Sequence, residues 1–296
     1  MPARRTLLWV LFKTSRPSQL LLVVGVYAFG AKIALVKGAA LSPEVFLAGG
    51  AVLLPVAASV HYANEYADYE TDALTDRTPF SGGSGALHRA GVGREVPLRA
   101  AALTLGVGVV LAAAFAASGR LPAPAVATVA VIAVLGWQYS VGPLKLAWRG
   151  WGELDNAVLG GLVLPVYGAA VVGGPTGEVA LAVVPFFLLV FLNLLATQWP
   201  DREADAAVGK RTLAVQWSPL RLRAVYAAAA LAAGLSLVAL SPEILGWTVV
   251  AASLLVTPLL VWGVMGYTKR HVPWPTVFAM VGLAVAQFLA WCWVAR

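Results

Sequence analysis

Cysteine, histidine and charged residues are all scarce in this chain of 296 residues. It has one cysteine and three histidines, and Asp, Glu, Lys and Arg together make up 12% of it, against roughly 25% in an average soluble domain. The single cysteine, Cys292, excludes an intrachain disulfide and a cysteine-based metal site. The histidines, His61, His88 and His271, do not have the spacing of metal ligands, which argues against a histidine-metal centre.

Most of the chain is hydrophobic instead. Hydrophobic residues make up 60% of it and the mean hydropathy is +0.80, values that indicate a membrane protein. A bilayer core about 30 Å thick is crossed by roughly 20 helical residues, and unpaired backbone groups cannot face lipid. The apolar runs are long and lack period-two alternation, so we expect an all-α polytopic membrane bundle rather than a barrel. Nine runs predict nine transmembrane helices, at residues 17–37, 43–64, 96–118, 122–140, 154–174, 178–198, 219–241, 244–266 and 273–294.

The rest of the sequence is too short for a second domain, so we expect residues 1–296 to form one integral-membrane domain. Residues 1–17 carry basic residues around a short apolar core. Lys13 and Arg16 follow that core directly, without a small-residue cleavage pattern, which favours an interfacial amphipathic segment over a cleaved signal peptide. The net charge of +7 has no soluble domain to carry it, so we expect no nucleic-acid partner.

The basic residues predict how the bundle is oriented. If the N-terminus is cytoplasmic, the N-terminal segment and the loops after the second, fourth, sixth and eighth runs share that side. Most of the acidic residues and most of the 21 Lys and Arg fall there, as the positive-inside rule requires. We therefore expect a multi-pass protein of the cell membrane with its N-terminus and its active site on the cytoplasmic side. The basic residues on the other side are Lys32, Lys37, Arg120 and Arg296.

Two acidic stripes continue apolar runs on this side. Asn64, Asp68 and Asp72 lie four residues apart at the end of the second run, and Asp201 and Asp205 have the same spacing after the sixth. Residues four apart share one face of a helix, so these like charges repel one another, most strongly near the membrane. Two aspartate pairs facing each other suit Mg²⁺, which binds a few carboxylates together with substrate phosphate oxygens. We therefore predict that the four aspartates hold Mg²⁺ and, through it, a diphosphate.

Basic residues near the stripes are candidates for binding that diphosphate. Arg77 follows the first stripe, and Lys145 follows the fourth run. Lys210 and Arg211 follow the second stripe. Such cations stabilise a diphosphate leaving group, although positive-inside anchoring explains the same residues. The run SGGSG, residues 81–85, fits either a nest of backbone N–H groups for phosphate or a flexible connector.

Nine helices with acidic motifs after the second and the sixth make the whole chain resemble the UbiA superfamily of intramembrane prenyltransferases. The sequence NEYADYETD matches that family's NxxxDxxxD motif, and DREAD matches its second acidic motif. The following GKRTLAV is also similar to the family, which makes its Lys and Arg candidate diphosphate contacts. The resemblance implies Mg²⁺-dependent transfer of a polyprenyl group from an isoprenyl diphosphate to an acceptor that captures the allylic cation. The matching residues are Asn64, Asp68, Asp72, Asp201, Asp205, Lys210 and Arg211.

Two further stretches resemble one branch of that family. Residues 139–154, YSVGPLKLAWRGWGEL, and residues 80–87, FSGGSGAL, are most similar to enzymes that prenylate 1,4-dihydroxy-2-naphthoate in menaquinone biosynthesis. This implies a small aromatic, naphthoate-type acceptor; hydroxybenzoate, a glycerol phosphate ether lipid and a carotenoid are the alternatives. Two departures concern the site: Gln198 follows Thr197 where many relatives have Asn or an acid, and Tyr139 and Lys145 are six residues apart instead of four. We count Tyr139, Lys145 and Gln198 among the substrate-binding residues.

Two other classes of protein also use membrane aspartates. A secondary transporter binds a coupling ion through acids near the bilayer midplane and on broken helices, whereas these acids lie at helix ends on one face. A phospholipid headgroup transferase carries a denser D-G-x-x-A-R type signature, which is not present in the sequence. We keep the transporter as the alternative function.

Overall fold

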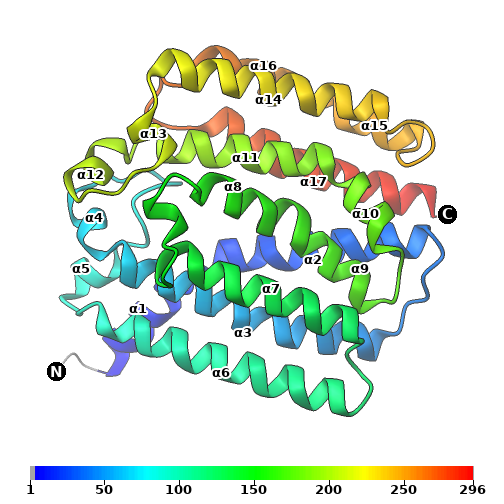
Figure 1. Cartoon of the computed structure of the whole chain (residues 1–296), viewed down its shortest axis with the longest axis horizontal. Helices are drawn as coiled ribbons and strands as arrows, with labels where there is room; N and C mark the ends of the chain where they lie inside the picture. Colours follow the sequence, from blue (N-terminus) through cyan, green and yellow to red (C-terminus); the bar gives the residue numbers. More distant parts are fainter. Residues whose placement is uncertain (1–3, 296) are drawn as a thin grey trace.

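The computed structural model describes residues 4–295, and within that range the chain is helical, with no strand (Figure 1). Seven helical segments are long and apolar enough to cross a membrane. One of them, Gly152–Val171, joins α8 (Gly152–Asn156), the π-helical turn η2 (Ala157–Val163) and α9 (Leu164–Val171). The other six are α2 (Pro17–Val36), α3 (Pro43–Ala67), α6 (Glu95–Ala117), α7 (Ala123–Ser140), α14 (Pro219–Ala239) and α17 (Trp274–Val294).

Two further spans are bent. Helix α10 (Thr176–Ala182) meets α11 (Val184–Gln198) at 54°, and α15 (Trp247–Leu254) meets α16 (Thr257–Gly266) at 44°. Pro185 and Pro258 follow the two breaks, and proline interrupts a helix because it lacks an N–H and clashes with the preceding turn. Counting each bent pair once gives up to nine spans among the described residues. The prediction of an all-α membrane bundle is therefore confirmed, and each predicted run ends within three residues of an observed boundary.

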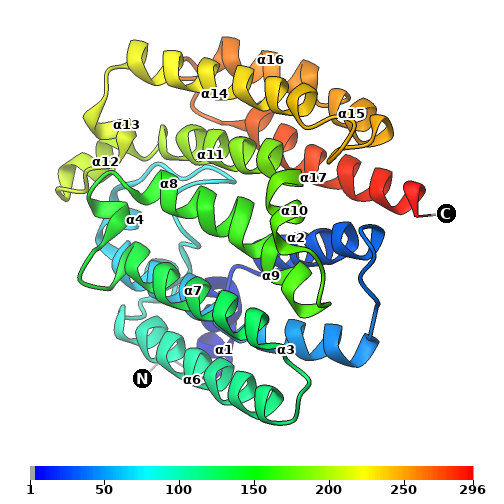
Figure 2. The ribbon, with the colours of Figure 1, turned by 45° about the vertical axis from the view of Figure 1, so that its right-hand side comes forward.

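Short helices gather at one end of the bundle. There α4 (Tyr69–Leu74) and α5 (Ala86–Ala90) follow α3, while α12 (Arg202–Ala207) and α13 (Leu213–Gln216) follow α11. Figures 1 and 2 place all four at the same end, opposite the C-terminus. The predicted interfacial segment forms α1 (Arg4–Thr14), which packs against α5 and exposes Leu8 and Phe12. These two apolar side chains suit a helix that lies at a membrane surface.

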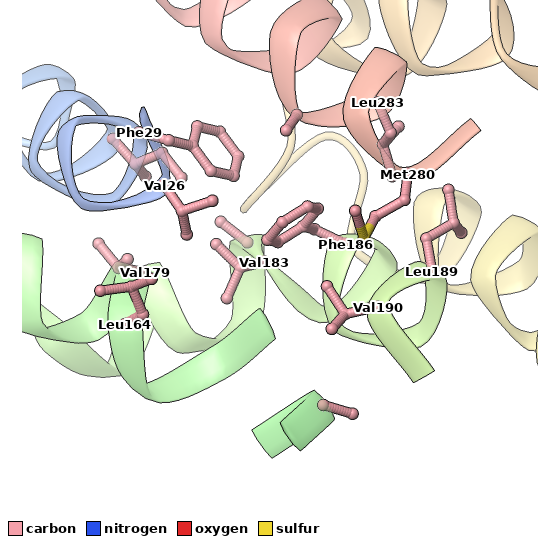
Figure 3. Close-up of a cluster of buried hydrophobic side chains, with 14 of the residues drawn as sticks. Val26, Phe29, Leu164, Val179, Val183, Phe186, Leu189, Val190, Met280 and Leu283 are labelled. Atoms are coloured by element: carbon pink, nitrogen blue, oxygen red, sulfur yellow. The ribbon is translucent and has the colours of Figure 1, made fainter. Parts of the chain in front are cut away.

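The apolar core joins helices that are far apart in the sequence. Figure 3 shows Phe29 of α2 and Phe186 of α11 pointing toward one another, with Met280 of α17 beside them. The two phenyl rings meet edge to face, with their centroids 6.0 Å apart. Because lipid tails are themselves apolar, close packing rather than removal from water holds such helices together. The core therefore ties the N-terminal, central and C-terminal spans into one body.

Two glycines allow α2 and the Gly152–Val171 span to approach closely. A Cβ atom added at Gly30 would overlap the backbone of Pro165, and one added at Gly168 would overlap the backbone of Tyr27. Small residues at such crossings let two backbones come into direct contact. This crossing fixes the span that begins at Gly152 against the first long helix.

We expect Gly30→Ala to lower the thermal unfolding temperature of the protein in detergent micelles. The added methyl group must displace the backbone of Pro165, and overpacking of this kind reduces stability by about 1–3 kcal/mol. The matched control is Gly25→Ala in the same helix, where nothing lies within 4 Å of the added atom. Equal unfolding temperatures for Gly30→Ala and Gly25→Ala would contradict the proposed close crossing.

Candidate functional site

The two acidic stripes meet at the end of the bundle that carries the short helices. Asp68 lies at the junction of α3 and α4, and Asp205 lies on α12. Between them is the ammonium group of Lys210, 2.9 Å from Oδ1 of Asp68 and 3.4 Å from Oδ1 of Asp205. The lysine side chain is 9% exposed and its two partners are 14% and 2% exposed. One buried cation thus connects carboxylates from the two halves of the chain.

The first stripe keeps its helical spacing although α3 ends at Ala67. The N–H of Asp68 donates to the carbonyl of Asn64 over 2.9 Å, and the N–H of Asp72 donates to the carbonyl of Asp68 over 2.8 Å. The side-chain amide of Asn64 donates to Oδ2 of Asp68 at 2.7 Å and to Oγ of Ser140 at 3.2 Å. Asn64 therefore orients one oxygen of Asp68 while Lys210 holds the other.

The segment 81–85 is an ordered loop between the two stripes. The N–H of Gly82 donates to Oδ2 of Asp201 over 3.3 Å, and a Cβ atom at Gly83 would overlap the carboxylate of Asp72. Gly82 and Gly83 have φ angles of +79° and +61°, which glycine adopts without steric cost. Arg77, a predicted diphosphate contact, donates from Nη2 to the carbonyl of Gly83. The loop thus touches an aspartate from each motif, and we name residues 81–85 the glycine loop.

Two buried glutamates support these loops, and the sequence analysis missed both. Glu65 is 1% exposed and pairs with Arg16 at 2.8 Å; it also accepts from the N–H and the hydroxyl of Ser84, at 2.9 and 2.6 Å. Glu153 is fully buried and accepts from the N–H of Leu213 over 2.6 Å. An acid inside or beside an apolar run is a functional candidate by default, so the position of each glutamate directly beside a predicted membrane run is the signal that could have found it.

Burial and mutual repulsion raise the pKa of three aspartates of the stripes, Asp72, Asp201 and Asp205. Burial, followed by the charge of Asp68, raises the pKa of Asp72 to about 8. The pKa of Asp201 rises to about 6 because of burial and then the charge of Asp205. Burial also raises the pKa of Asp205 to about 6, against the opposing effect of Lys210. Burial disfavours the charge on Lys210, but the carboxylates of Asp68 and Asp205 outweigh it and raise the pKa of the lysine.

Several oxygen atoms at this end are buried without a hydrogen-bond partner. They include Oδ1 of Asp201 and Oε1 of Gln198, while Oδ1 of Asp205 accepts no hydrogen bond and has only its ion pair with Lys210. Leaving a buried acceptor unpaired is unfavourable, and hard divalent cations bind oxygen atoms of this kind. Within residues 4–295, however, no three His, Cys, Asp or Glu side chains converge into a closed metal site. The donor set therefore fits a cation that takes some of its ligands from a bound molecule.

The remaining predicted residues lie around this centre at different depths. Tyr139, near the end of α7, is partly buried, and its ring lies 3.2 Å from a Cβ atom placed at Gly152. Lys145 and Arg211 are exposed, so neither is committed to a buried partner. Thr197 donates its hydroxyl to the carbonyl of Asn193 in its own helix. Gln198 is buried with its oxygen unpaired.

Solved membrane proteins share this architecture at low sequence identity. A UbiA homologue from Aeropyrum pernix K1, solved in its apo form, has a TM-score of 0.70 and 17% identity over 90% of this chain and 96% of its own. A UbiA homologue from Archaeoglobus fulgidus, solved bound to GPP and Mg²⁺, has a TM-score of 0.67 and 17% identity over 97% and 99% of the two chains. A digeranylgeranylglyceryl phosphate synthase has a TM-score of 0.66 and 16% identity over 98% of both.

At 16–17% identity these solved structures show only that the fold is shared. The family is assigned from the sequence. None of the curated protein sequences matches this chain. The model of the UbiA prenyltransferase family matches residues 22–268, a range that contains both acidic motifs, the glycine loop and Lys210. Because that match covers most of its length, the chain belongs to the UbiA prenyltransferase family.

Proposed function

We propose that this protein transfers a polyprenyl group from an isoprenyl diphosphate to a small aromatic acceptor. The observation that carries the proposal is the meeting of both acidic motifs at Lys210, with 2.9 and 3.4 Å between its ammonium and the carboxylates of Asp68 and Asp205. This arrangement concentrates carboxylates and a cation at one end of a membrane bundle. It suits a substrate with a charged diphosphate head and an apolar tail.

Mg²⁺ is the cation that we expect at the aspartates. UbiA homologues from Archaeoglobus fulgidus have been solved with GPP or DMAPP together with Mg²⁺, and with Cd²⁺. In this chain Asp68, Asp72, Asp201 and Asp205 would hold the ion, and the unpaired buried Oδ1 of Asp201 supports that role. When bound, Mg²⁺ acts as a Lewis acid toward the charge that develops on the leaving diphosphate.

Other residues of the chain orient the metal ligands, contact the diphosphate and exclude water. Asn64 orients Asp68 by donating to Oδ2, and Lys210 is close enough to both motifs to donate a charge-assisted hydrogen bond to a diphosphate oxygen. The exposed side chains of Arg211 and Lys145 add positive charge at the same end. The surrounding apolar helices exclude water, which favours capture of the allylic cation by the acceptor over its hydrolysis.

A naphthoate-type acceptor, as in menaquinone biosynthesis, is the finer part of this proposal. It rests on the similarity of residues 139–154 and 80–87 to that branch. Tyr139 and the unpaired oxygen of Gln198 are our candidates for contact with the acceptor. The structural likeness to a digeranylgeranylglyceryl phosphate synthase makes a glycerol phosphate ether lipid the main competing acceptor.

We also propose that the acid-bearing end faces the cytoplasm. Arg4, Arg5 and Lys13 lie on α1 at that end, and both long loops there carry further Lys and Arg. The positive-inside rule assigns such a concentration of basic residues to the cytoplasmic face. A water-soluble diphosphate head group and Mg²⁺ would then enter from the cytoplasm.

Replacing Asp68 or Asp201 by Asn should abolish prenyl transfer in the presence of Mg²⁺. We expect activity to fall by about 100-fold or more, because losing even a supporting partner of a metal ligand reduces activity about 10–100-fold. The assay follows a labelled polyprenyl diphosphate with protein in lipid. Asp76→Asn is the matched control, since Asp76 is an exposed aspartate of the same loop and should leave activity unchanged. Full activity in Asp68→Asn would refute the metal-holding role.

The acceptor can be identified by testing a panel of candidate acceptors for product formation. The protein is incubated with Mg²⁺, a polyprenyl diphosphate and, in separate reactions, dihydroxynaphthoate, hydroxybenzoate, glycerol phosphate ether lipid or a carotenoid. We expect product with dihydroxynaphthoate. Product with only another acceptor would support prenyl transfer but refute the naphthoate-type acceptor. If the folded protein consumes no diphosphate with any acceptor, the result would favour a transporter that uses the aspartates for ion coupling.

Divalent-cation affinity should increase as the pH rises. Without a metal, Asp201 and Asp205 hold protons below a pH of about 6 and Asp72 holds one up to about 8, and a cation must displace these protons to bind. Mn²⁺ binding, followed by electron paramagnetic resonance, should therefore be weakest near pH 5 and strengthen through pH 8. In Asp72→Asn the increase above about pH 7 should disappear. Affinity that does not change with pH would contradict this.

A further inference from the structure

The carboxylate of Glu65 makes more polar contacts than an ordinary residue within a helix. Its carboxylate is 1% exposed and receives Nε and Nη2 of Arg16, both at 2.8 Å. It also receives the backbone N–H of Ser84 at 2.9 Å and the hydroxyl of Ser84 at 2.6 Å. A buried carboxylate is tolerated only when it is paired in this way. Glu65 therefore anchors one specific conformation of the residues that it binds.

The anchored residue belongs to the glycine loop. Ser84 follows Gly82 and Gly83, which touch Asp201 and Asp72 respectively. The N–H of Gly82 restrains one oxygen of Asp201, while Gly83 limits where the carboxylate of Asp72 can lie. Holding Ser84 fixes the loop from its far end, because only Gly83 separates Gly82 from Ser84 and its anchor.

The other partner of Glu65 connects this loop to α1. Arg16 lies between α1 and α2 with φ +53° and ψ +67°, a left-handed conformation that is unfavourable for a residue with a side chain. That conformation directs the chain from α1 into α2 while the guanidinium reaches Glu65. Nearby, the hydroxyl of Tyr62 donates to the carbonyl of Leu11 in α1 at 3.0 Å. Both contacts tie α1 to the helix that carries the first acidic motif.

We propose that Glu65 is a positioning residue, which with Arg16 and Ser84 holds the glycine loop so that Asp72 and Asp201 stay in place for a divalent cation. The inference rests on the proposed function only in assigning that cation to the aspartates. In this role Glu65 needs no contact with substrate or metal. It acts through Ser84 and the loop, and it links the geometry of the site to α1.

The experiment uses the full-length protein in lipid nanodiscs and two readouts that need no turnover. Hydrogen–deuterium exchange reports the order of residues 81–85, whose Gly82 and Ser84 amides are both hydrogen-bonded. Electron paramagnetic resonance measures Mn²⁺ affinity in the presence of inorganic pyrophosphate. The variants are Glu65→Gln, Ser84→Ala and, as a conservative rescue that keeps the hydroxyl, Ser84→Thr. Glu44→Gln is the matched control, because Glu44 forms an exposed ion pair with Arg120 away from this site.

We expect faster exchange in the glycine loop and about 10-fold weaker Mn²⁺ binding in Glu65→Gln and Ser84→Ala, the size of effect typical of residues that orient metal ligands. Ser84→Thr and Glu44→Gln should match the wild type in both readouts. If Glu65→Gln does not fold, Ser84→Ala carries the test, since it removes one hydroxyl and no charge. Unchanged loop exchange, or faster exchange with unchanged Mn²⁺ affinity, would overturn the inference.

These outcomes are independent of whether the protein transfers a prenyl group. Wild-type protein that binds Mn²⁺ but consumes no diphosphate would refute the proposed function and leave the positioning role supported by the Ser84 variants. If the wild-type protein transfers the prenyl group but Ser84→Ala and Glu65→Gln leave Mn²⁺ binding unaffected, the proposed function would be supported and the positioning role of Glu65 refuted. Wild-type protein that does not bind Mn²⁺ would overturn both.

Discussion

The ammonium group of Lys210 lies between the carboxylates of Asp68 and Asp205, and the arrangement of both long loops follows from that contact. Carboxylates gathered at a membrane boundary repel one another strongly, because the surrounding dielectric constant is low. A buried cation relieves the repulsion only if it reaches both groups at once. The loop after α11 must therefore fold back toward the end of α3, and Glu153 holds it there by accepting from the N–H of Leu213.

The rest of the bundle is a rigid frame for that end. The direct contact of α2 with the Gly152–Val171 span at Gly30 and Gly168, and the packing of Phe29 against Phe186, leave little freedom between the central helices. The loops at the acid-bearing end contain glycines with positive φ angles, and hydrogen bonds to Asp201 and Glu65 hold the glycine loop in place. A closely packed bundle with an anchored loop at one end suits a site that holds its aspartates in fixed positions.

The membrane spans and the acidic stripes could be predicted from the sequence because both are local patterns. A run of apolar residues defines a span, and a spacing of four defines a face, as for Asn64 and Asp68. The support of the glycine loop could not be predicted in this way. Arg16 and Glu65 are 49 residues apart, and Gly82 and Asp201 are 119 apart, so no local period connects them. The spacing also could not reveal that Lys210 would lie between two of the aspartates.

The long sequence separation within the site has a consequence for biosynthesis. Asp68 and Lys210 are 142 residues apart, and a ribosome adds roughly 5–20 residues per second. The first acidic motif therefore leaves the ribosome many seconds before its cationic partner exists. During that interval Asp68 is without the ammonium group that pairs with it in the finished structure. The ion pair between Arg16 and Glu65 can form early, because both residues belong to the N-terminal part of the chain. The first half of the site can therefore adopt much of its final conformation before the second half is inserted.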